Sequence, residues 1–314
     1  MNIIFCGTPQ FAVPSLERLL AENFTISLVI TNPDEPRGRG YKLALSPVKA
    51  AALRAGLSIF QPARLRDPAA QTKISAERPD AIVVVAYGHL IPPWMISLPA
   101  LGCINLHASL LPRYRGAAPV AWAIIRGERT TGVTTMKIDA GLDTGDILLQ
   151  QETSIRADDT AGTLSDRLSQ AGASLMVETL RGLELVEIQP RQQDDRLATL
   201  APVLKKSDGR IDWNMTAREI GCRVRGMQPW PVAFTSFRNR NLQLWSVRTA
   251  EVLAEPIPLI APGEIVAIRG RLFAGCGAGT QLELLELQAE GRKRVPARDF
   301  VNGMHPRQGE RLGA

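Results

Sequence analysis

The residues with the clearest chemical potential lie in the segment INLHASLLPRYRGAAPV, residues 104–120. Asn105 and His107 interrupt an apolar run at alternate positions, so on a strand their side chains share one face. A neutral imidazole can accept a proton near neutral pH, and an amide NH2 can donate a hydrogen bond to a developing oxyanion. The pair predicts acid–base chemistry at a carbonyl centre. The alternative is a core histidine beside a capping asparagine.

The segment IDAGLDTGDILLQ contains three carboxylates that are candidates for a third catalytic group. Asp139, Asp143 and Asp146 stand in a glycine-containing loop. A carboxylate close to His107 would orient its ring and stabilise its protonated form. Metal binding by the three acids is the alternative, although the spacing lacks the Asp-x-Asp-x-Asp-Gly pattern of a calcium loop. The sequence leaves open which aspartate approaches His107.

Several other chemistries have little support. The first predicted strand leads into Gly7–Pro9, without the Gly-x-Gly-x-x-Gly turn that binds a dinucleotide, and the chain has no Walker Gly-Lys pair and no Gly-x-Ser-x-Gly elbow. Hydride transfer, ATP use and serine catalysis are therefore disfavoured. Cys103 should share the face of Asn105 and is a conceivable thiol nucleophile, but no neighbouring cation in the sequence would lower its pKa.

The elements that must position these residues are readable from hydrophobic patterns. Strands are expected at residues 2–7, 25–31, 80–88, 102–107, 131–139 and 145–155, and helices at 9–23, 46–56, 70–79 and 159–183. Ser46 is the expected N-cap of its helix, with Pro47 at the first position. Val- and Ile-rich runs separated by helices predict an α/β fold whose parallel sheet is covered on both faces. In such sheets ligands bind outside the carboxyl ends of the strands, where Asn105 and His107 would lie.

The last third of the chain has a different character. Residues 189–204 are polar and patternless and are expected to be a linker between domains at 1–188 and 205–314. After a helix predicted at 216–227, short strands separated by glycine turns predict a small antiparallel β-barrel. Lys and Arg balance Asp and Glu, 20 against 20, in residues 1–204, whereas residues 205–314 carry 17 against 11. The whole net charge of +6 therefore lies in the last third, which favours a polyanionic partner over a merely soluble basic surface.

A second basic feature is the loop TNPDEPRGRGYKLALSPVK at residues 31–49. Arg37, Arg39 and Lys42 alternate with glycines, so cationic side chains stand on a flexible backbone. Long loops within compact domains tend to be functional or disordered, and cations on such a loop suit phosphate contacts. A solvated mobile loop is the alternative.

Cellular location is indicated by what the sequence lacks. The start MNIIFCGTP has no basic region that would mark a signal peptide. Residues 81–112 contain no Asp, Glu, Lys or Arg, but four prolines would break a membrane-spanning helix there. The four cysteines form no Cys-x-x-Cys pair, which disfavours zinc or a disulfide framework. A cytoplasmic protein without a membrane partner is expected.

The motifs NLHASLLPRYRGAAP and DAGLDTGDIL closely resemble the folate-dependent formyltransferase family. FCGTPQFAVPSL and PRGRGYKLALSPVK resemble those members that formylate charged initiator tRNA, and the likeness runs along essentially the whole chain. The resemblance implies an N-terminal Rossmann-like domain that binds 10-formyltetrahydrofolate. It also implies a C-terminal OB-like β-barrel that helps to hold initiator methionyl-tRNA, and no metal in the chemistry.

The resemblance also assigns individual residues. Asn105, His107 and Asp143 match the family's catalytic Asn-x-His pair and distal Asp. The folate-binding residues are expected to be Ser109, Leu110, Leu111 and Pro112, together with Tyr87 and Gly88. The tRNA contacts are expected at Arg37, Arg39, Lys42, Lys205 and Lys206. The roles of Arg113 and Arg115 stay open between substrate phosphate and support of the loop.

Three alternatives remain. Formyltransferases acting on glycinamide ribonucleotide would leave the basic last third unexplained, and those acting on sugar nucleotides would not need the 37–42 loop. A catalytically silent RNA-binding protein would explain the charge but not an intact Asn-His-Asp set. Nothing in the sequence requires a dimer, and a monomer is expected.

Overall fold

A computed structural model describes residues 1–37, 42–250 and 258–313. The chain divides into two compact units. The N-terminal unit comprises Met1–Pro119, Thr130–Ser154 and Ser165–Ala201, and the C-terminal unit comprises Val120–Arg129, Ile155–Leu164 and Pro202–Ala314. The expected functional division at residues 189–204 stays a prediction. None of the described helices is long and apolar enough to span a membrane.

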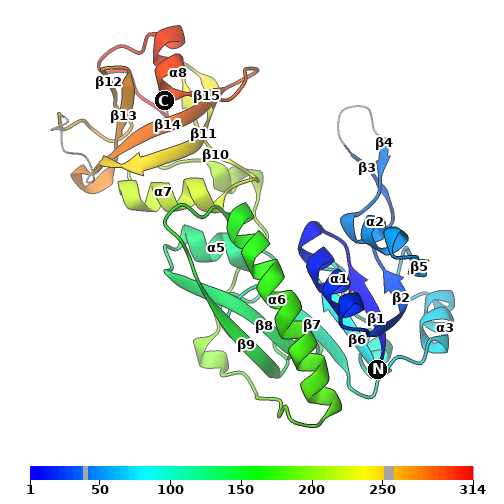
Figure 1. Cartoon of the computed structure of the whole chain (residues 1–314). Coiled ribbons are helices and arrows are strands. Elements are labelled where there is room, and N and C mark those ends of the chain that lie inside the picture. The colour runs from blue at the N-terminus through cyan, green and yellow to red at the C-terminus, as the bar shows by residue number, and fades with distance from the viewer. Residues whose placement is uncertain (38–41, 251–257, 314) are drawn as a thin grey trace. The chain divides into compact units, whose positions relative to one another are not determined.

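The N-terminal unit is built on one mixed sheet with strand order β5-β2-β1-β6-β7-β8-β9 (Figure 1). Its strands are β1 (Asn2–Gly7), β2 (Thr25–Ile30), β5 (Ile59–Phe60), β6 (Ala81–Val85), β7 (Cys103–His107), β8 (Thr130–Lys137) and β9 (Ile147–Ser154). The pairs from β5 to β7 are parallel, and β8 is antiparallel to both β7 and β9. The parallel part confirms the predicted α/β class, and the order reverses between β1 and β6.

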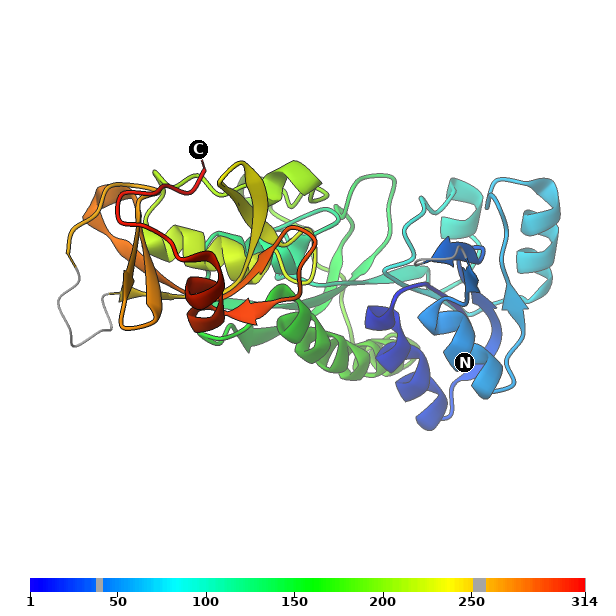
Figure 2. The same ribbon diagram turned by 90° about the horizontal axis from the view of Figure 1, so that it is seen from above.

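Helices cover both faces of this sheet. The helices of this unit are α1 (Val13–Ala21), α2 (Pro47–Arg54), α3 (Pro68–Ala76), α4 (Pro93–Ile96) and α6 (Ala161–Glu184), with the short 3-10 helix η1 (Gln10–Ala12). A further 3-10 helix, η2 (Asp195–Leu197), has no buried residue. Figures 1 and 2 show α1 and α6 side by side, and Arg181 of α6 pairs with Glu22 at the end of α1. α3 and α4 cover the other face through Ile74 and Met95.

Side chains alternate along β7, and this alternation determines on which face of the sheet Asn105 and His107 lie. Cys103 packs in the cluster that contains Ile74 and Met95. Leu106 points the other way, since a Cβ added at Gly172 of α6 would lie 2.5 Å from its side chain. Because strand side chains alternate, Asn105 and His107 lie on the face of Cys103, away from α6. The shared face predicted for these residues is confirmed.

Local chemistry explains the helix starts. The Ser46 hydroxyl accepts a hydrogen bond from the Lys49 backbone N–H at 3.1 Å, and Pro47 begins α2, as predicted. Thr216 and Glu219 form a reciprocal capping box at the start of α7 (Ala217–Gly226). Within the expected linker, Arg191 forms a β-bridge with Ile147 and Leu200 forms one with Arg115.

The C-terminal unit contains an antiparallel sheet of order β10-β11-β14-β13-β12, with β15 on β14. Its elements are β10 (Ala233–Phe237), β11 (Arg240–Thr249), β12 (Ile265–Ile268), β13 (Arg271–Gly275), β14 (Gln281–Ala289), β15 (Val295–Pro296), α7, α8 (Ala297–Met304), η3 (Lys206–Gly209) and η5 (Gly277–Gly279). Leu244, Leu272 and Leu284 are fully buried in its core. The antiparallel prediction is confirmed. Over the described strands the path from β10 to β12 is open, so the expected OB-like barrel is not confirmed.

Several short elements were not expected from the sequence. They include α4, α5 (Pro119–Ile125), α8, β5, β15, and a hairpin of β3 (Glu35–Arg37) and β4 (Lys42–Ala44) within the basic loop. The short apolar and polar runs in these segments carry too few turns to produce a clear period.

Candidate active site

Asn105 lies on β7 between the strands β6 and β8. Asn105 pairs with Val84 of β6 in parallel register and with Met136 of β8 in antiparallel register. Its side chain is half-buried, and its amide has no hydrogen-bond partner elsewhere in the described parts of the chain. The side chain is only half-buried and its atoms are not among the buried unpartnered polar atoms, so the amide is open to solvent or to a bound group.

The tautomer of His107 follows from its hydrogen bond. The ring is 6% exposed, and its Nε2 lies 2.9 Å from the carbonyl oxygen of Tyr114. A carbonyl oxygen only accepts, so Nε2 carries a proton and donates it. The neutral ring therefore presents the lone pair of Nδ1, and that nitrogen gains a proton only in the imidazolium form.

Asp143 is the aspartate that meets this nitrogen. Its Oδ2 lies 3.6 Å from His107 Nδ1 and accepts a hydrogen bond from the Gly116 backbone N–H at 2.8 Å. The side chain is 16% exposed, which leaves the pair little solvent screening. The choice among three aspartates, which the sequence left open, is thereby made by tertiary structure.

The other two aspartates have different surroundings. Asp139 accepts hydrogen bonds from the Gly141 N–H and the Thr144 hydroxyl, which close the turn of the loop. The carbonyl of Asp146 accepts from the Lys137 N–H. No cluster of three or more His, Cys, Asp or Glu side chains able to hold a metal ion occurs in the portion of the chain that the structure describes.

The Ser-Leu-Leu-Pro turn begins two residues after His107 and is held by hydrogen bonds to Arg113 and to Thr134 of β8. The Ser109 hydroxyl donates to the Arg113 carbonyl at 2.6 Å, and the Leu111 N–H donates to Thr134 Oγ1 at 3.1 Å. Ser109 and Leu111 are buried, whereas Leu110 and Pro112 are half-buried. The hydroxyl of Ser109 therefore fixes the turn, and the latter two residues have the accessible side-chain surface.

Tyr87 and Gly88 follow the carboxyl end of β6, next to the point where the strand order reverses. The Thr8 hydroxyl, just after β1, donates to the Tyr87 carbonyl at 3.4 Å. The Tyr87 side chain is buried, and burial together with the nearby Cys6 raises the pKa of its phenol. Gly88 has a φ of +87°, which favours glycine. Crevices at such reversal points are the usual ligand sites of open α/β sheets.

Cys103 lies too deep to act as the nucleophile considered above. Its side chain is 1% exposed, and its Sγ donates to the Met95 carbonyl at 3.2 Å. Burial raises the pKa of its thiol to about 12. The reactive thiolate is thus disfavoured at neutral pH.

The predicted tRNA-binding residues are only partly described. Arg39 lies outside the described residues, while Arg37 ends β3 and Lys42 begins β4. Lys205 and Lys206 are exposed in the C-terminal unit.

Arg115 turns inward, unlike a phosphate-binding surface arginine. It is 7% exposed, and its guanidinium donates to Gln193 Oε1 from Nε at 3.1 Å and from Nη2 at 2.8 Å. It therefore supports the loop. Gln193 itself was not expected from the sequence, because it stands in the patternless polar segment.

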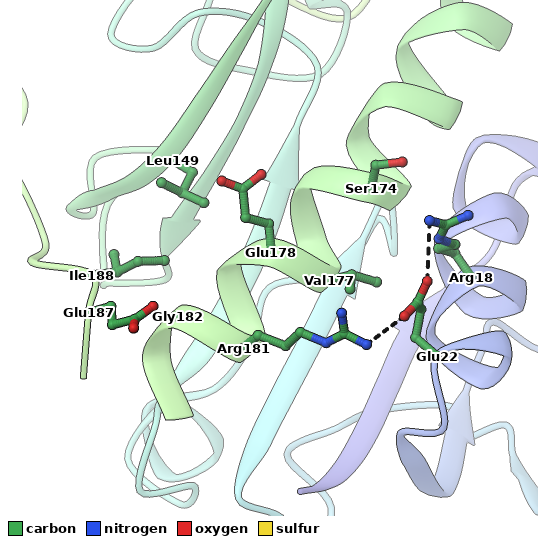
Figure 3. A pocket seen from close by; sticks show the side chains of 10 residues that line it. All are labelled: Arg18, Glu22, Leu149, Ser174, Val177, Glu178, Arg181, Gly182, Glu187 and Ile188. Carbon is green, nitrogen blue, oxygen red and sulfur yellow. Dashed lines mark hydrogen bonds and ion pairs between the residues drawn. The ribbon is translucent and has the colours of Figure 1, made fainter. Parts of the chain in front are cut away.

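A cavity of about 340 Å³ in the N-terminal unit does not coincide with these residues (Figure 3). It lies along α1 and α6, where Glu22 pairs with both Arg18 and Arg181. Its lining contains none of the predicted catalytic or folate-binding residues. The candidate site is therefore placed at β7, where Asn105, His107 and Asp143 come together, and not in this cavity.

Two family models together match most of the chain. The family model described as formyl transferase matches residues 1–180, and the model described as formyl transferase, C-terminal domain, matches residues 203–305. The chain belongs to the formyl transferase family. The resemblance seen in the sequence is confirmed, and the matched range 1–180 contains Asn105, His107 and Asp143.

Relatives within this family align along the full length. A methionyl-tRNA formyltransferase of Koribacter versatilis is 52% identical over 100% of this chain and 99% of that protein. A methionyl-tRNA formyltransferase of Acidobacterium capsulatum is 50% identical over 100% of both. Among solved structures, the sugar 3N-formyl transferase WlaRD, in the presence of dTDP and 5-N-formyl-THF, has a TM-score of 0.67 and 19% identity. The match covers 93% of this chain and 99% of that one and shows a shared fold.

Proposed function

We propose that this chain transfers the formyl group of 10-formyltetrahydrofolate to the α-amino group of initiator methionyl-tRNA. The observation that carries the proposal is the contact of His107 Nδ1 with Asp143 Oδ2 at 3.6 Å, on the strand that also presents the unpartnered amide of Asn105. The full-length relatives named methionyl-tRNA formyltransferase support the choice of acceptor.

The three side chains divide the chemistry between them. The neutral amine attacks the formyl carbon, forming a C–N bond and a tetrahedral oxyanion, to which the Asn105 amide donates a hydrogen bond. His107 Nδ1 accepts the proton that the attacking amine releases, and Asp143 stabilises the resulting imidazolium. The bond from carbon to the folate nitrogen then breaks, and His107 returns the proton to that nitrogen.

Folate is proposed to bind at the carboxyl ends of β1, β6 and β7. Leu110 and Pro112 offer apolar surface to the pterin side of the site, while Ser109 and Leu111 maintain the turn that presents them. Tyr87 and Gly88 are proposed to border the folate at the carboxyl end of β6, beside the point where the strand order reverses, a location that suits a flat heterocycle. The WlaRD structure obtained with 5-N-formyl-THF supports a folate co-substrate for this fold. No step in the reaction calls for a metal.

The basic elements are proposed to hold the tRNA. Residues 1–188 would form the catalytic domain and residues 205–314, with the OB-like class predicted for them, a tRNA-binding domain joined by residues 189–204. The excess of 17 basic over 11 acidic residues in the second supports a polyanionic partner. Lys205 and Lys206 are exposed in it, and Arg37, Arg39 and Lys42 would contact the acceptor end. The enzyme is proposed to be a cytoplasmic monomer.

One experiment tests the acceptor and the site together. Formyl transfer from 10-formyltetrahydrofolate is measured with initiator methionyl-tRNA, elongator methionyl-tRNA, glycinamide ribonucleotide and an amino-sugar nucleotide. We expect transfer to initiator methionyl-tRNA, and a loss of about 10²–10³ in rate for Asn105→Ala. Transfer to a small acceptor with none to charged tRNA would overturn the proposed acceptor. Near-wild-type turnover of Asn105→Ala, His107→Ala and Asp143→Ala would overturn the assigned site.

A further inference from the structure

Gln193 has a buried side-chain amide that hydrogen-bonds to the loop of Asp143 and to Arg115. Its side chain is 7% exposed. Its Nε2 donates to the backbone carbonyls of Asp143 and Gly145, both at 2.8 Å. Its Oε1 accepts both hydrogen bonds from Arg115. Each donor and acceptor of the amide is therefore used, and the side chain ties the loop of Asp143 to the loop that follows β7.

The loop on the other side of this connection contacts both members of the catalytic pair. Tyr114 accepts from His107 Nε2 through its carbonyl, and Gly116 donates to the Asp143 carboxylate through its N–H. Arg115, between them, reaches Gln193 and also pairs with Asp195 at 2.7 Å. Fixing Arg115 thus fixes the two backbone groups that hold His107 and Asp143.

The route of the chain explains why Asp143 needs holding. Because β8 is antiparallel to β7, the chain leaves β8 beside the start of β7, where the Ile138 N–H donates to the Cys103 carbonyl. His107 lies at the other end of β7, four residues or about 13 Å away. The loop that carries Asp143 must therefore turn back toward His107, and regular sheet pairing does not hold it there.

We infer that Gln193, clamped by Arg115, is a positioning residue that sets the distance between the Asp143 carboxylate and His107. This rests on the proposed catalytic role of Asp143. Gln193 contacts no reacting atom and acts by fixing the backbone at Asp143 and Gly145. Its loss should lower kcat, because misplacement of a catalytic group by about 1 Å can cost on the order of 10²-fold in rate. It should leave the KM values for folate and tRNA within about twofold, since no contact to either substrate is removed.

Gln193→Glu is the sharpest test variant. The carboxylate retains the acceptor for Arg115, but it lacks the N–H donors to the two carbonyls. Expected is a fall in kcat of about 10- to 100-fold, measured on enzyme whose urea unfolding curve shows that it is folded under the assay conditions. Gln192→Glu is the matched control, since it makes the same substitution at the exposed neighbouring residue, outside this hydrogen-bond network, and should leave kcat unchanged. A kcat for Gln193→Glu within twofold of wild type would refute the positioning role.

The same substitution in an Asp143→Ala background separates positioning from a general structural effect. If Gln193 acts through Asp143, Gln193→Glu should lower kcat of the Asp143→Ala enzyme by less than about twofold. An equal fall in both backgrounds would show that Gln193 acts elsewhere and would overturn the inference while leaving the proposed catalytic role of Asp143 intact. A wild-type kcat for Asp143→Ala alone would instead remove that role, and the inference with it.

Discussion

Replacing Asp143 by Asn removes one charge while keeping the shape of the side chain. At the observed 3.6 Å separation, two unit charges attract by about 4.6 kcal/mol at an effective dielectric constant of 20. The Gly116 N–H shares the same oxygen, and the 16% exposure of Asp143 admits some solvent, so about 2–3 kcal/mol is a reasonable net loss for the imidazolium state. Since 1.36 kcal/mol is a factor of ten in rate, kcat should fall about 30- to 150-fold.

The assay is single-turnover formylation of initiator methionyl-tRNA at saturating folate, which isolates chemistry from product release. Asp146→Asn is the matched control: it removes an equal charge three residues away and should leave the rate near wild type. Within the described residues, Asp146 forms a hydrogen bond only through its backbone carbonyl. If Asp143→Asn reacts within threefold of wild type at an unchanged unfolding midpoint, the charge of Asp143 does not stabilise His107, and the proposed division of roles is wrong.

Further predictions concern stability and recognition. Gly116→Ala should destabilise the protein by about 2 kcal/mol or more in urea unfolding, because φ is +118° and the new Cβ would lie 2.8 Å from the Ala201 carbonyl oxygen. Burial disfavours the charge of Glu283, but two arginines outweigh it and lower its pKa. Its stabilisation is therefore present above the unfolded pKa of about 4.3 and lost as pH falls toward the lower folded value, so wild type should lose stability below pH 4.3 more steeply than Glu283→Gln. Arg39→Ala should raise KM for tRNA more than for folate, which steady-state kinetics with each substrate varied will test. Native Cys103 should resist iodoacetamide, measured by mass spectrometry, because its thiol is buried.

Local signals in the sequence predict most of the regular elements. The Ser46-Pro47 start of α2 and the Thr216-capped α7 fall where caps and periodicity place them. The direction of β8 does not follow from such signals, because an apolar run has the same pattern in parallel and antiparallel pairing. The sequence also does not predict α8, because its two buried residues, Ala297 and Phe300, define only one turn of an amphipathic face.

The candidate site likewise has a part that the sequence predicts and a part that it does not. Asn105 and His107 lie two residues apart on one strand, so the period of two suffices to put them on one face. The third member comes from a loop, and the positions of Asp139, Asp143 and Asp146 along the chain do not determine which one returns to His107. The resemblance to the family selects Asp143. In the structure, Asp143 is held near His107 by contacts with Gly116 and Gln193, about 30 and 50 positions away, and no local pattern in the sequence predicts such contacts.

The segment Tyr114–Gly116 shows why this support is built from a turn. Its three consecutive residues aim a carbonyl at His107, a guanidinium at Gln193 and an N–H at Asp143. A strand or helix would direct successive backbone groups along its own regular ladder and could not serve all three. Left-handed φ values of +61° at Tyr114 and +118° at Gly116 break that regularity on both sides of Arg115. Strained backbone at this place is consistent with a functional loop, and it means that a substitution at Gly116 should disturb Asp143 and His107 together rather than either alone.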